Sequence, residues 1–426
     1  MERRDFLKLC ALAGLGIAAP IGLTRNAYGE GGITEGPYYL VFNADGGWDT
    51  SSLMDPKGVN DINRLYREGD IRTEGPHRFA PTAGRFERGM SNEAFFAKYG
   101  RDLLTLNGLD YSTNNHDPGK RYMATGKLDS LVYPTFAALV AASKGSDVPL
   151  AFVSFGNYSA TGNLLPLSRI SNIGQLSLLG LPDHHRGNVS NPYHEEDFVQ
   201  RRIQQALKEE HEAQGARAQL PRVERSQSML YAAQLNATTL SRLLPYIGDE
   251  QPEEALSRQA NIALAGFKAG VCVSANLNIS RFDSHDDNDS IQMQVIPELL
   301  AGIDYAVERA EALGIRDKVV IVIQSEMGRT PWYNENGGKD HWSIGSVMFM
   351  GPGIRGNRVL GATDDGQKLL KVNPDTLALD AGAGGIHIRP EHLHQALRTY
   401  AGIEDHALAA RFPLNLAAAE RLNTLW

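Results

Sequence analysis

The sequence predicts an α/β protein with a doubly wound, mostly parallel β-sheet, and three observations support this fold class. Several short runs of residues are apolar on both faces, which is typical of buried parallel strands. Longer segments with helical periodicity lie between these runs. The most reactive polar residues follow the apolar runs directly, which is where open α/β sheets place their functional sites.

The expected strands and helices alternate along the chain, as they do in parallel sheets that are connected by crossover helices. We expect helices at residues 133–143, 291–313 and 390–400. The runs that we expect to form strands are residues 38–43, 103–106, 150–155, 271–276, 319–324 and 347–350.

A different composition marks the segment from about residue 195 to residue 268. It is rich in Gln, Glu, Arg, Ala and Leu, and Pro221 and Pro245 interrupt it. Helix breakers within a helix-forming composition indicate several separate helices. We therefore expect one α/β domain over residues 30–426, with a helical insertion at about 195–268 that covers one face or edge of the sheet.

The first 29 residues have the features of a twin-arginine export signal. Arg3 and Arg4 precede an apolar stretch, residues 9–23, whose hydrophobicity is lowered by Gly14, Gly16 and Pro20. The segment ends at residues 27–29, which include the small residues that such a removable signal needs. Such a stretch is too short and too broken to span a membrane stably. It predicts recognition by the twin-arginine translocase and a periplasmic or secreted protein.

Composition excludes several classes of partner. The chain carries 42 basic and 50 acidic residues, for a net charge of -8, so it lacks the basic surface that binds nucleic acid or anionic lipid. Of the two cysteines, Cys10 lies in the signal and Cys272 in an apolar run. An intrachain disulfide is therefore not expected in the exported protein.

Carboxylates and imidazoles gather in four loops that we expect at strand ends. Each of these residues alone could cap a turn or form a structural ion pair. Together they predict one site for a divalent metal, with zinc or manganese best suited to mixed carboxylate and imidazole ligands. The candidate metal ligands are Asp45, Asp283, His285, Glu326 and His341.

A fifth segment, residues 114–126, predicts a helix that begins next to His116, because Asp117 and Pro118 are typical of a helix start. The positive end of a helix favours an anion, and Lys120 and Arg121 add positive charge. We expect Lys120 and Arg329 to bind substrate and His116 to be catalytic. An ordinary capped surface helix is the alternative.

Six short sequence segments together resemble the exported bacterial family known as domain of unknown function 1501, which is grouped with the alkaline phosphatase and sulfatase superfamily. The resemblance extends from the export signal to the C-terminal helix. It implies an alkaline-phosphatase-like core. The matching segments are residues 46–57, 115–126, 282–285, 325–331, 337–342 and 361–364.

The resemblance also implies roles for particular residues. Asp45 takes the position of the superfamily's first metal-binding aspartate. Asp283 and His285 resemble its middle ligand pair, although the superfamily usually spaces them further apart. Glu326 replaces an aspartate at the next strand end, and His341 resembles the last histidine ligand.

The chain departs from the superfamily at the nucleophile. Alkaline phosphatases have a serine or threonine where this sequence has His116, and the Cys-x-Pro-x-Arg motif of sulfatases does not occur. We expect an exported metal-dependent hydrolase of phosphate or sulfate esters, acting on a small molecule or glycan, in which water or His116 attacks. The alternatives are a non-catalytic protein that binds an anion or glycan, and an envelope-assembly protein.

Overall fold

The computed structural model describes residues 33–83, 86, 88–145, 148, 150–169, 197–216, 242–248 and 251–426. The predicted export signal, residues 1–29, lies outside the described residues. None of the helices in the described part of the chain is both long enough and apolar enough to cross a membrane.

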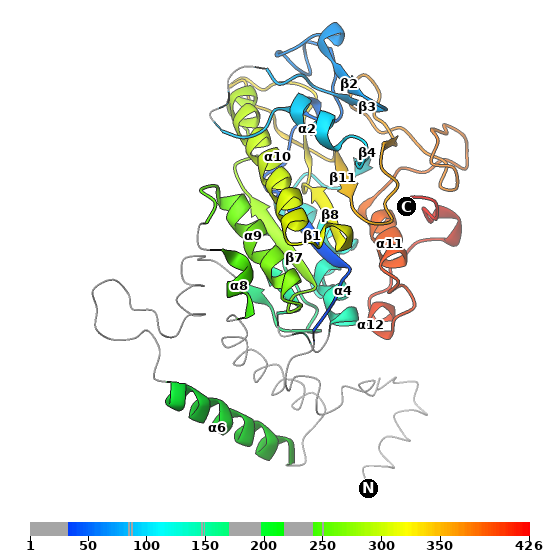
Figure 1. Ribbon diagram of the computed structural model, residues 1–426. Helices are drawn as coiled ribbons and strands as arrows, with labels where there is room; N and C mark the ends of the chain where they lie inside the picture. The colour runs from blue at the N-terminus through cyan, green and yellow to red at the C-terminus, as the bar shows by residue number, and fades with distance from the viewer. Residues whose placement is uncertain are drawn as a thin grey trace.

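An eight-stranded sheet forms the centre of the fold (Figure 1). β1 pairs in parallel with β7 and β8, and β5 pairs in parallel with β7 and β6. β12 is parallel to β4, while β11 is antiparallel to both β4 and β8. Among the strands of this sheet in the described part of the chain, seven therefore run in one direction and β11 opposes them. The spatial order is β12 (Arg358–Leu360), β4 (Leu104–Asp110), β11 (Ile344–Met350), β8 (Val319–Gln324), β1 (Tyr38–Ala44), β7 (Ser274–Ile279), β5 (Phe152–Ser154) and β6 (Ser168–Arg169).

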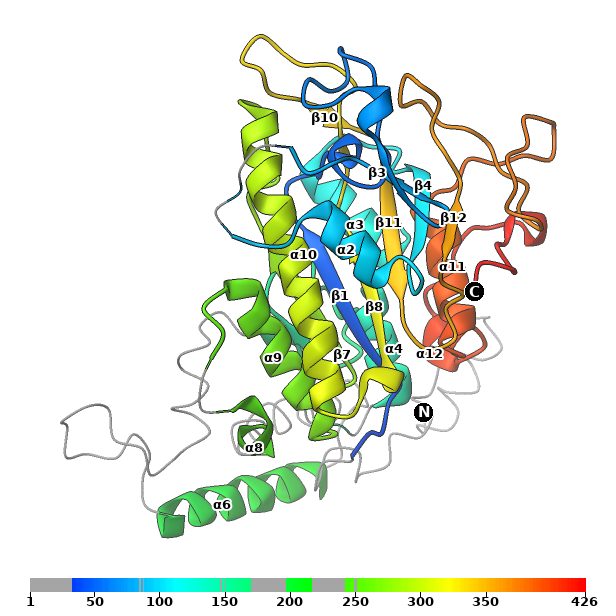
Figure 2. The same cartoon turned by 45° about the horizontal axis from the view of Figure 1, so that its top comes forward.

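Helices cover both faces of the sheet, and alternate side chains of β1 pack into the two helical layers (Figures 1 and 2). Leu40 and Phe42 point into the core on one face, and Tyr39 and Val41 point into the core on the other. The helices on the first face are α2 (Asn92–Tyr99), α9 (Ala255–Lys268) and α10 (Asn288–Ala312), and those on the second are α3 (His116–Thr125), α4 (Phe136–Lys144) and α11 (Pro390–Tyr400).

The remaining elements are short or lie outside the main layers. Two small antiparallel ribbons pair β2 with β3 and β9 with β10. Their bounds are β2 (Arg72–Glu74), β3 (His77–Phe79), β9 (Gly328–Arg329) and β10 (His341–Trp342), and the other elements are α6 (Asp197–Ala216), α8 (Leu244–Ile247), α12 (Ala407–Ala410), η1 (Thr50–Ser52), η2 (Glu68–Asp70), η4 (Arg316–Lys318) and η5 (Ala418–Glu420).

The α/β class with a mostly parallel sheet is confirmed. The run 319–324 is β8 with the predicted bounds, and the pattern 390–400 is α11. Residues 255–268 of the expected insertion form α9, whose apolar side belongs to the helical layer over β1. α6 belongs to the same expected insertion, most of whose other residues lie outside the described residues.

Candidate metal site at the edge of the sheet

The carboxyl ends of the parallel strands deliver five of the predicted residues to one edge of the sheet. Asp45 follows β1, Asp283 and His285 follow β7, and Glu326 follows β8. His116 begins α3, which comes after β4. Since parallel strands end at the same edge, segments far apart in sequence meet there.

His341 reaches this edge by a different route from the one expected. The loop that contains His341 does not follow a parallel strand that ends at this edge of the sheet. Instead, His341 lies in β10, just before β11 begins, and β11 runs antiparallel to β8. The start of an antiparallel strand lies at the edge where its parallel neighbours end. Figure 2 shows β10 and α3 near the upper end of β1.

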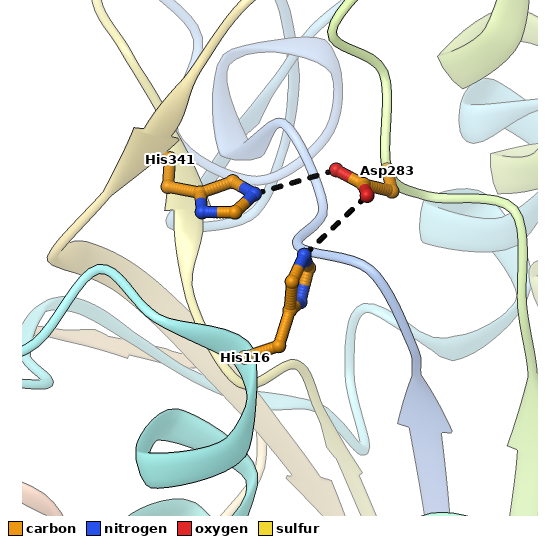
Figure 3. Close-up of side chains that lie close together, drawn as sticks. All are labelled: His116, Asp283 and His341. Atoms are coloured by element: carbon orange, nitrogen blue, oxygen red, sulfur yellow. Dashed lines mark hydrogen bonds and ion pairs between the residues drawn. The ribbon is translucent and has the colours of Figure 1, made fainter.

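Three histidine Nε2 atoms surround the carboxylate of Asp283 (Figure 3 shows two of them). The distance from Asp283 Oδ2 to His116 Nε2 is 3.4 Å. Asp283 Oδ1 lies 3.2 Å from His285 Nε2 and 3.4 Å from His341 Nε2. The Nε2 atoms of His285 and His341 are 2.9 Å apart. Nitrogen and oxygen donors of four side chains therefore converge on one small volume.

The other nitrogen of each ring has an acceptor that fixes its orientation. His116 Nδ1 lies 2.9 Å from Glu326 Oε1, and His285 Nδ1 lies 2.9 Å from Asp340 Oδ1. His341 Nδ1 lies 2.8 Å from the carbonyl oxygen of Asn114. A carbonyl or carboxylate oxygen only accepts, so a neutral ring that carries its proton on Nδ1 satisfies these shorter contacts and keeps a lone pair on Nε2 for a metal ion. This is the arrangement of histidines that ligate metals.

The donor set fits a divalent metal ion. Ligand atoms of His116, Asp283 and His341 lie within 4.8 Å of one another. Ligands around a tetrahedral zinc ion are about 3.4 Å apart, because zinc bonds to nitrogen and oxygen are about 2.0–2.2 Å long. Imidazoles with one carboxylate suit zinc better than magnesium or calcium, which prefer oxygen.

Asp283 is held by the buried guanidinium of Arg329. The Nη2 of Arg329 donates to Asp283 Oδ1 at 2.6 Å, and the Arg329 side chain is 0% exposed. Burial opposes the charge of Asp283, but the hydrogen bond and charge of Arg329 hold the pKa of this carboxyl below its usual range. Asp283 therefore stays ionised, as a metal ligand must.

Arg329, for which substrate binding stays a prediction, also donates to three backbone carbonyl oxygens. Its Nε donates to the carbonyl oxygen of Gly47 at 2.9 Å, its Nη1 to that of Lys339 at 2.9 Å, and its Nη2 also to that of Gly46. A guanidinium that is buried and bonded in this way has no open face toward a ligand. Its position favours a structural role in fixing Asp283 and the loop after β1.

Asp45 and Glu326 lie at the site but outside the closest donor group. Asp45 Oδ1 accepts a hydrogen bond from Lys120 Nζ at 2.6 Å. Glu326 is 1% exposed, and its Oε1 accepts both from Gly46 N at 2.8 Å and from the ring of His116. In this arrangement Glu326 orients His116, and Asp45 neutralises Lys120.

The site combines groups whose pKa values are shifted in opposite directions. The hydrogen bond to Glu326 raises the pKa of His116, although burial acts against this. Burial and the charge of Arg329 lower the pKa of His341. Burial would lower the pKa of Lys120, but its hydrogen bond to Asp45 raises it. Clusters of perturbed groups of this kind are typical of functional sites.

Two glycines allow the loops to pack this closely. Gly46 has φ +123°, and a Cβ at this position would lie 2.4 Å from the backbone nitrogen of Asp283. A Cβ on Gly119 would lie 2.6 Å from the carbonyl oxygen of Glu326. Any side chain at either position would therefore separate α3 or the loop after β1 from the rest of the site.

Sequence reasoning missed the partners that orient the histidines. Asn114 contributes its backbone carbonyl oxygen, and because every residue has one, the sequence does not mark this partner of His341. Asp340 directly precedes His341 in a loop that we had singled out, so its carboxylate was a detectable signal for a partner of a histidine. Lys339, in the same loop, forms a buried ion pair with Asp49 at 2.6 Å.

Comparison with known families identifies the chain. Residues 40–412 match the model of a family described as a protein of unknown function, DUF1501. The chain belongs to this family. Among curated proteins, none matches the sequence.

Several solved structures resemble the DUF1501 protein at low identity. Ps i-CgsB is 11% identical with a TM-score of 0.41, over 86% of this chain and 72% of that one. The PsFucS1 sulfatase from Pseudoalteromonas sp. is 12% identical with a TM-score of 0.35, over 89% and 70% of the two chains. The putative sulfatase yidJ from Bacteroides fragilis is 9% identical with a TM-score of 0.36, over 95% and 80%. The function must therefore be argued from the site itself.

Proposed function

We propose that this DUF1501 protein is an exported, metal-dependent hydrolase of phosphate or sulfate esters. The observation that carries the proposal is the convergence of three histidine Nε2 atoms on the Asp283 carboxylate, with each Nδ1 anchored by an oxygen. Three imidazoles with one carboxylate are a donor set that zinc favours, and manganese is the second candidate.

A divalent ion supplies Lewis acidity, which polarises an ester oxygen and makes water a stronger nucleophile at neutral pH. The ring of His116 is held between Glu326 and Asp283, so we assign it to the metal-binding group. Of the two attacking species that we considered, water and His116, this assignment favours water. Water then becomes the attacking species.

Lys120 is the residue that we propose to bind the anionic part of the ester. It lies one turn after His116 on α3, and its side chain is partly exposed. Its ammonium already pairs with Asp45, so a phosphate or sulfate would compete with that carboxylate for the same charge. An ammonium with three donors can serve both partners.

We further propose that residues 1–29 direct the protein to the twin-arginine translocase and hence to the periplasm or the outside of the cell. The pattern of Arg3 and Arg4 before an interrupted apolar stretch supports this. Twin-arginine export carries folded proteins, which agrees with loading of a metal before translocation.

Two measurements on protein purified without a chelator test the proposed hydrolase. Elemental analysis should find about one equivalent of zinc or manganese per chain. Hydrolysis of 4-nitrophenyl phosphate, bis(4-nitrophenyl) phosphate and 4-nitrophenyl sulfate should be detected for at least one ester, and His341→Ala should lose both metal and turnover. Bound metal without any turnover would favour the non-catalytic binding protein. Absence of metal would favour the assembly role.

A further inference from the structure

A cleft of about 570 Å³ adjoins the candidate metal site. Its volume falls within the range of about 300–1,000 Å³ that is usual for small-molecule sites. His341 belongs both to the lining of this cleft and to the metal-binding group. A molecule bound in the cleft would therefore hold its attached groups next to the metal site.

Two tryptophans give the cleft an aromatic wall. Trp332 is 48% exposed, although large aromatic side chains are usually buried. It packs edge to face against Trp342, with ring centroids 5.3 Å apart and planes at 77°. This contact leaves no slot between the rings for a flat base or aryl group. A single indole surface suits a ring that has one apolar face.

The rest of the lining is rich in groups that hydrogen-bond without charge. Ser112, Thr113, Asn114 and Ser343 offer hydroxyl and amide groups. Apart from His341, the charged member of the lining is Asp340, a carboxylate, and no lysine or arginine is among the described residues that line the cleft. A second anionic group on the ligand would be repelled here. The cleft thus fits a ligand that is uncharged but rich in hydroxyl groups.

The walls of the cleft are fixed in place by hydrogen bonds. Asn114 on one wall accepts from the ring of His341 on the other. Ser343 accepts from the backbone nitrogen of Tyr111 at 2.8 Å. The indole nitrogen of Trp342 donates to the carbonyl oxygen of Gln367 at 3.2 Å. A site that is already formed loses little conformational entropy when it binds.

We propose that this cleft binds an uncharged sugar ring, and that the substrate is a carbohydrate phosphate or sulfate ester. The apolar face of the sugar packs on Trp332, and its hydroxyl groups bond to the residues of the loop 112–114 and to Ser343. This inference rests on the proposed hydrolase function, because it names the group that carries the ester.

The first experiment measures sugar binding without any reaction. Neutral methyl glycosides and disaccharides are titrated into the full chain, and tryptophan fluorescence reports binding. At least one sugar should bind, and Trp332→Ala should weaken that binding about tenfold while metal content stays the same. Trp332→Tyr should restore part of the affinity. Phe198→Ala, which removes an exposed aromatic outside this lining, is the matched control.

The second experiment compares leaving groups. The wild type should hydrolyse glucose 6-phosphate or N-acetylglucosamine 6-sulfate with kcat/KM at least about tenfold above that for the 4-nitrophenyl ester of the same acid. Trp332→Ala should raise KM for the sugar ester more than it lowers kcat, because the ring contact is remote from the reacting bond.

The outcomes separate this inference from the proposed function. Hydrolysis with no preference for sugar esters, or with a preference for adenosine 5′-monophosphate, would overturn the sugar site alone. Sugar binding that depends on Trp332, without hydrolysis of any ester, would support the cleft and overturn the hydrolase. If no sugar binds, or if Trp332→Ala binds sugars as the wild type does, the sugar site is wrong whatever the activity.

Discussion

The Nδ1 atom of His116 lies 2.9 Å from Oε1 of Glu326, a carboxylate that is almost completely buried at the end of β8. The same oxygen accepts a hydrogen bond from the backbone nitrogen of Gly46, at the end of β1. A single buried carboxylate therefore links two strand ends and fixes the orientation of a candidate metal ligand. Such carboxylate and histidine pairs tune metal affinity.

We predict that Glu326→Gln weakens metal binding by about 10–100-fold, the usual effect of changing a group that orients a histidine ligand. The amide oxygen can still accept from Gly46 or from His116, but the negative charge that makes the imidazole a better ligand is lost. Competition with a chelating dye measures the affinity. Asp117→Asn, which removes an exposed carboxylate on α3, is the control. Equal affinities of the Glu326→Gln variant and the wild type would contradict the role of Glu326.

We predict that His116→Ala and His341→Ala both lose bound metal, because each removes one of the converging donors. His285→Ala should show a smaller loss, since this residue lies outside the closest group of three donors. Elemental analysis after dialysis against trace-metal buffer measures the content. His406→Ala, an exposed histidine that caps α12, is the control. Full metal content in His116→Ala would return His116 to the role of nucleophile.

Much of the fold followed from the sequence because its central strands are rich in apolar residues on both faces. The run 319–324 was predicted with its observed bounds, and it lies next to β1 at the centre of the sheet. Strands buried on both faces need apolar residues at most positions, so their positions are visible in the sequence. The convergence of Asp45, Asp283 and Glu326 then follows from parallel strands ending at one edge.

Other features depend on packing and leave no pattern in the sequence. The apolar run at 347–350 does not indicate that β11 is antiparallel, because a buried strand has the same composition in either direction. In the sequence, Arg329 comes just after a predicted strand, which is where an anion-binding residue is expected. The packed structure shows that its side chain is completely buried. Likewise, the orientation of the His116 ring depends on how closely α3 approaches the loop at Glu326.

We predict that replacing Arg3 and Arg4 together with lysine keeps the precursor in the cytoplasm. The twin-arginine signal requires the guanidinium pair, whereas a general basic region would accept lysine. Cell fractionation with an antibody measures the distribution. Replacing Lys8 with arginine is the control, because it preserves charge and the paired arginines. Normal export of the double variant would contradict the assignment.

We predict that Lys339→Met destabilises the protein by about 3–5 kcal/mol at neutral pH, because it leaves the carboxylate of Asp49 buried without its partner. Asp49 keeps hydrogen bonds from Asn288 at 2.9 Å and from Ser51 at 2.6 Å, which limit the loss. Urea unfolding in the presence of a chelator measures the free energy without a contribution from metal. Lys368→Met, at an exposed position, is the control.

The pH dependence of this variant has a definite sign. Burial would raise the pKa of Asp49, but the charge of Lys339 holds it below the ordinary value of 3.8 in the wild type. The pair therefore contributes stability above about pH 4 that is lost as pH falls through the lowered pKa. Without Lys339, burial raises the pKa of Asp49 above its unfolded value, so protonation relieves the unpaired charge. The difference in unfolding free energy between wild type and Lys339→Met should shrink from pH 7.5 to pH 5, and a constant or growing difference would show that the loss comes from packing instead.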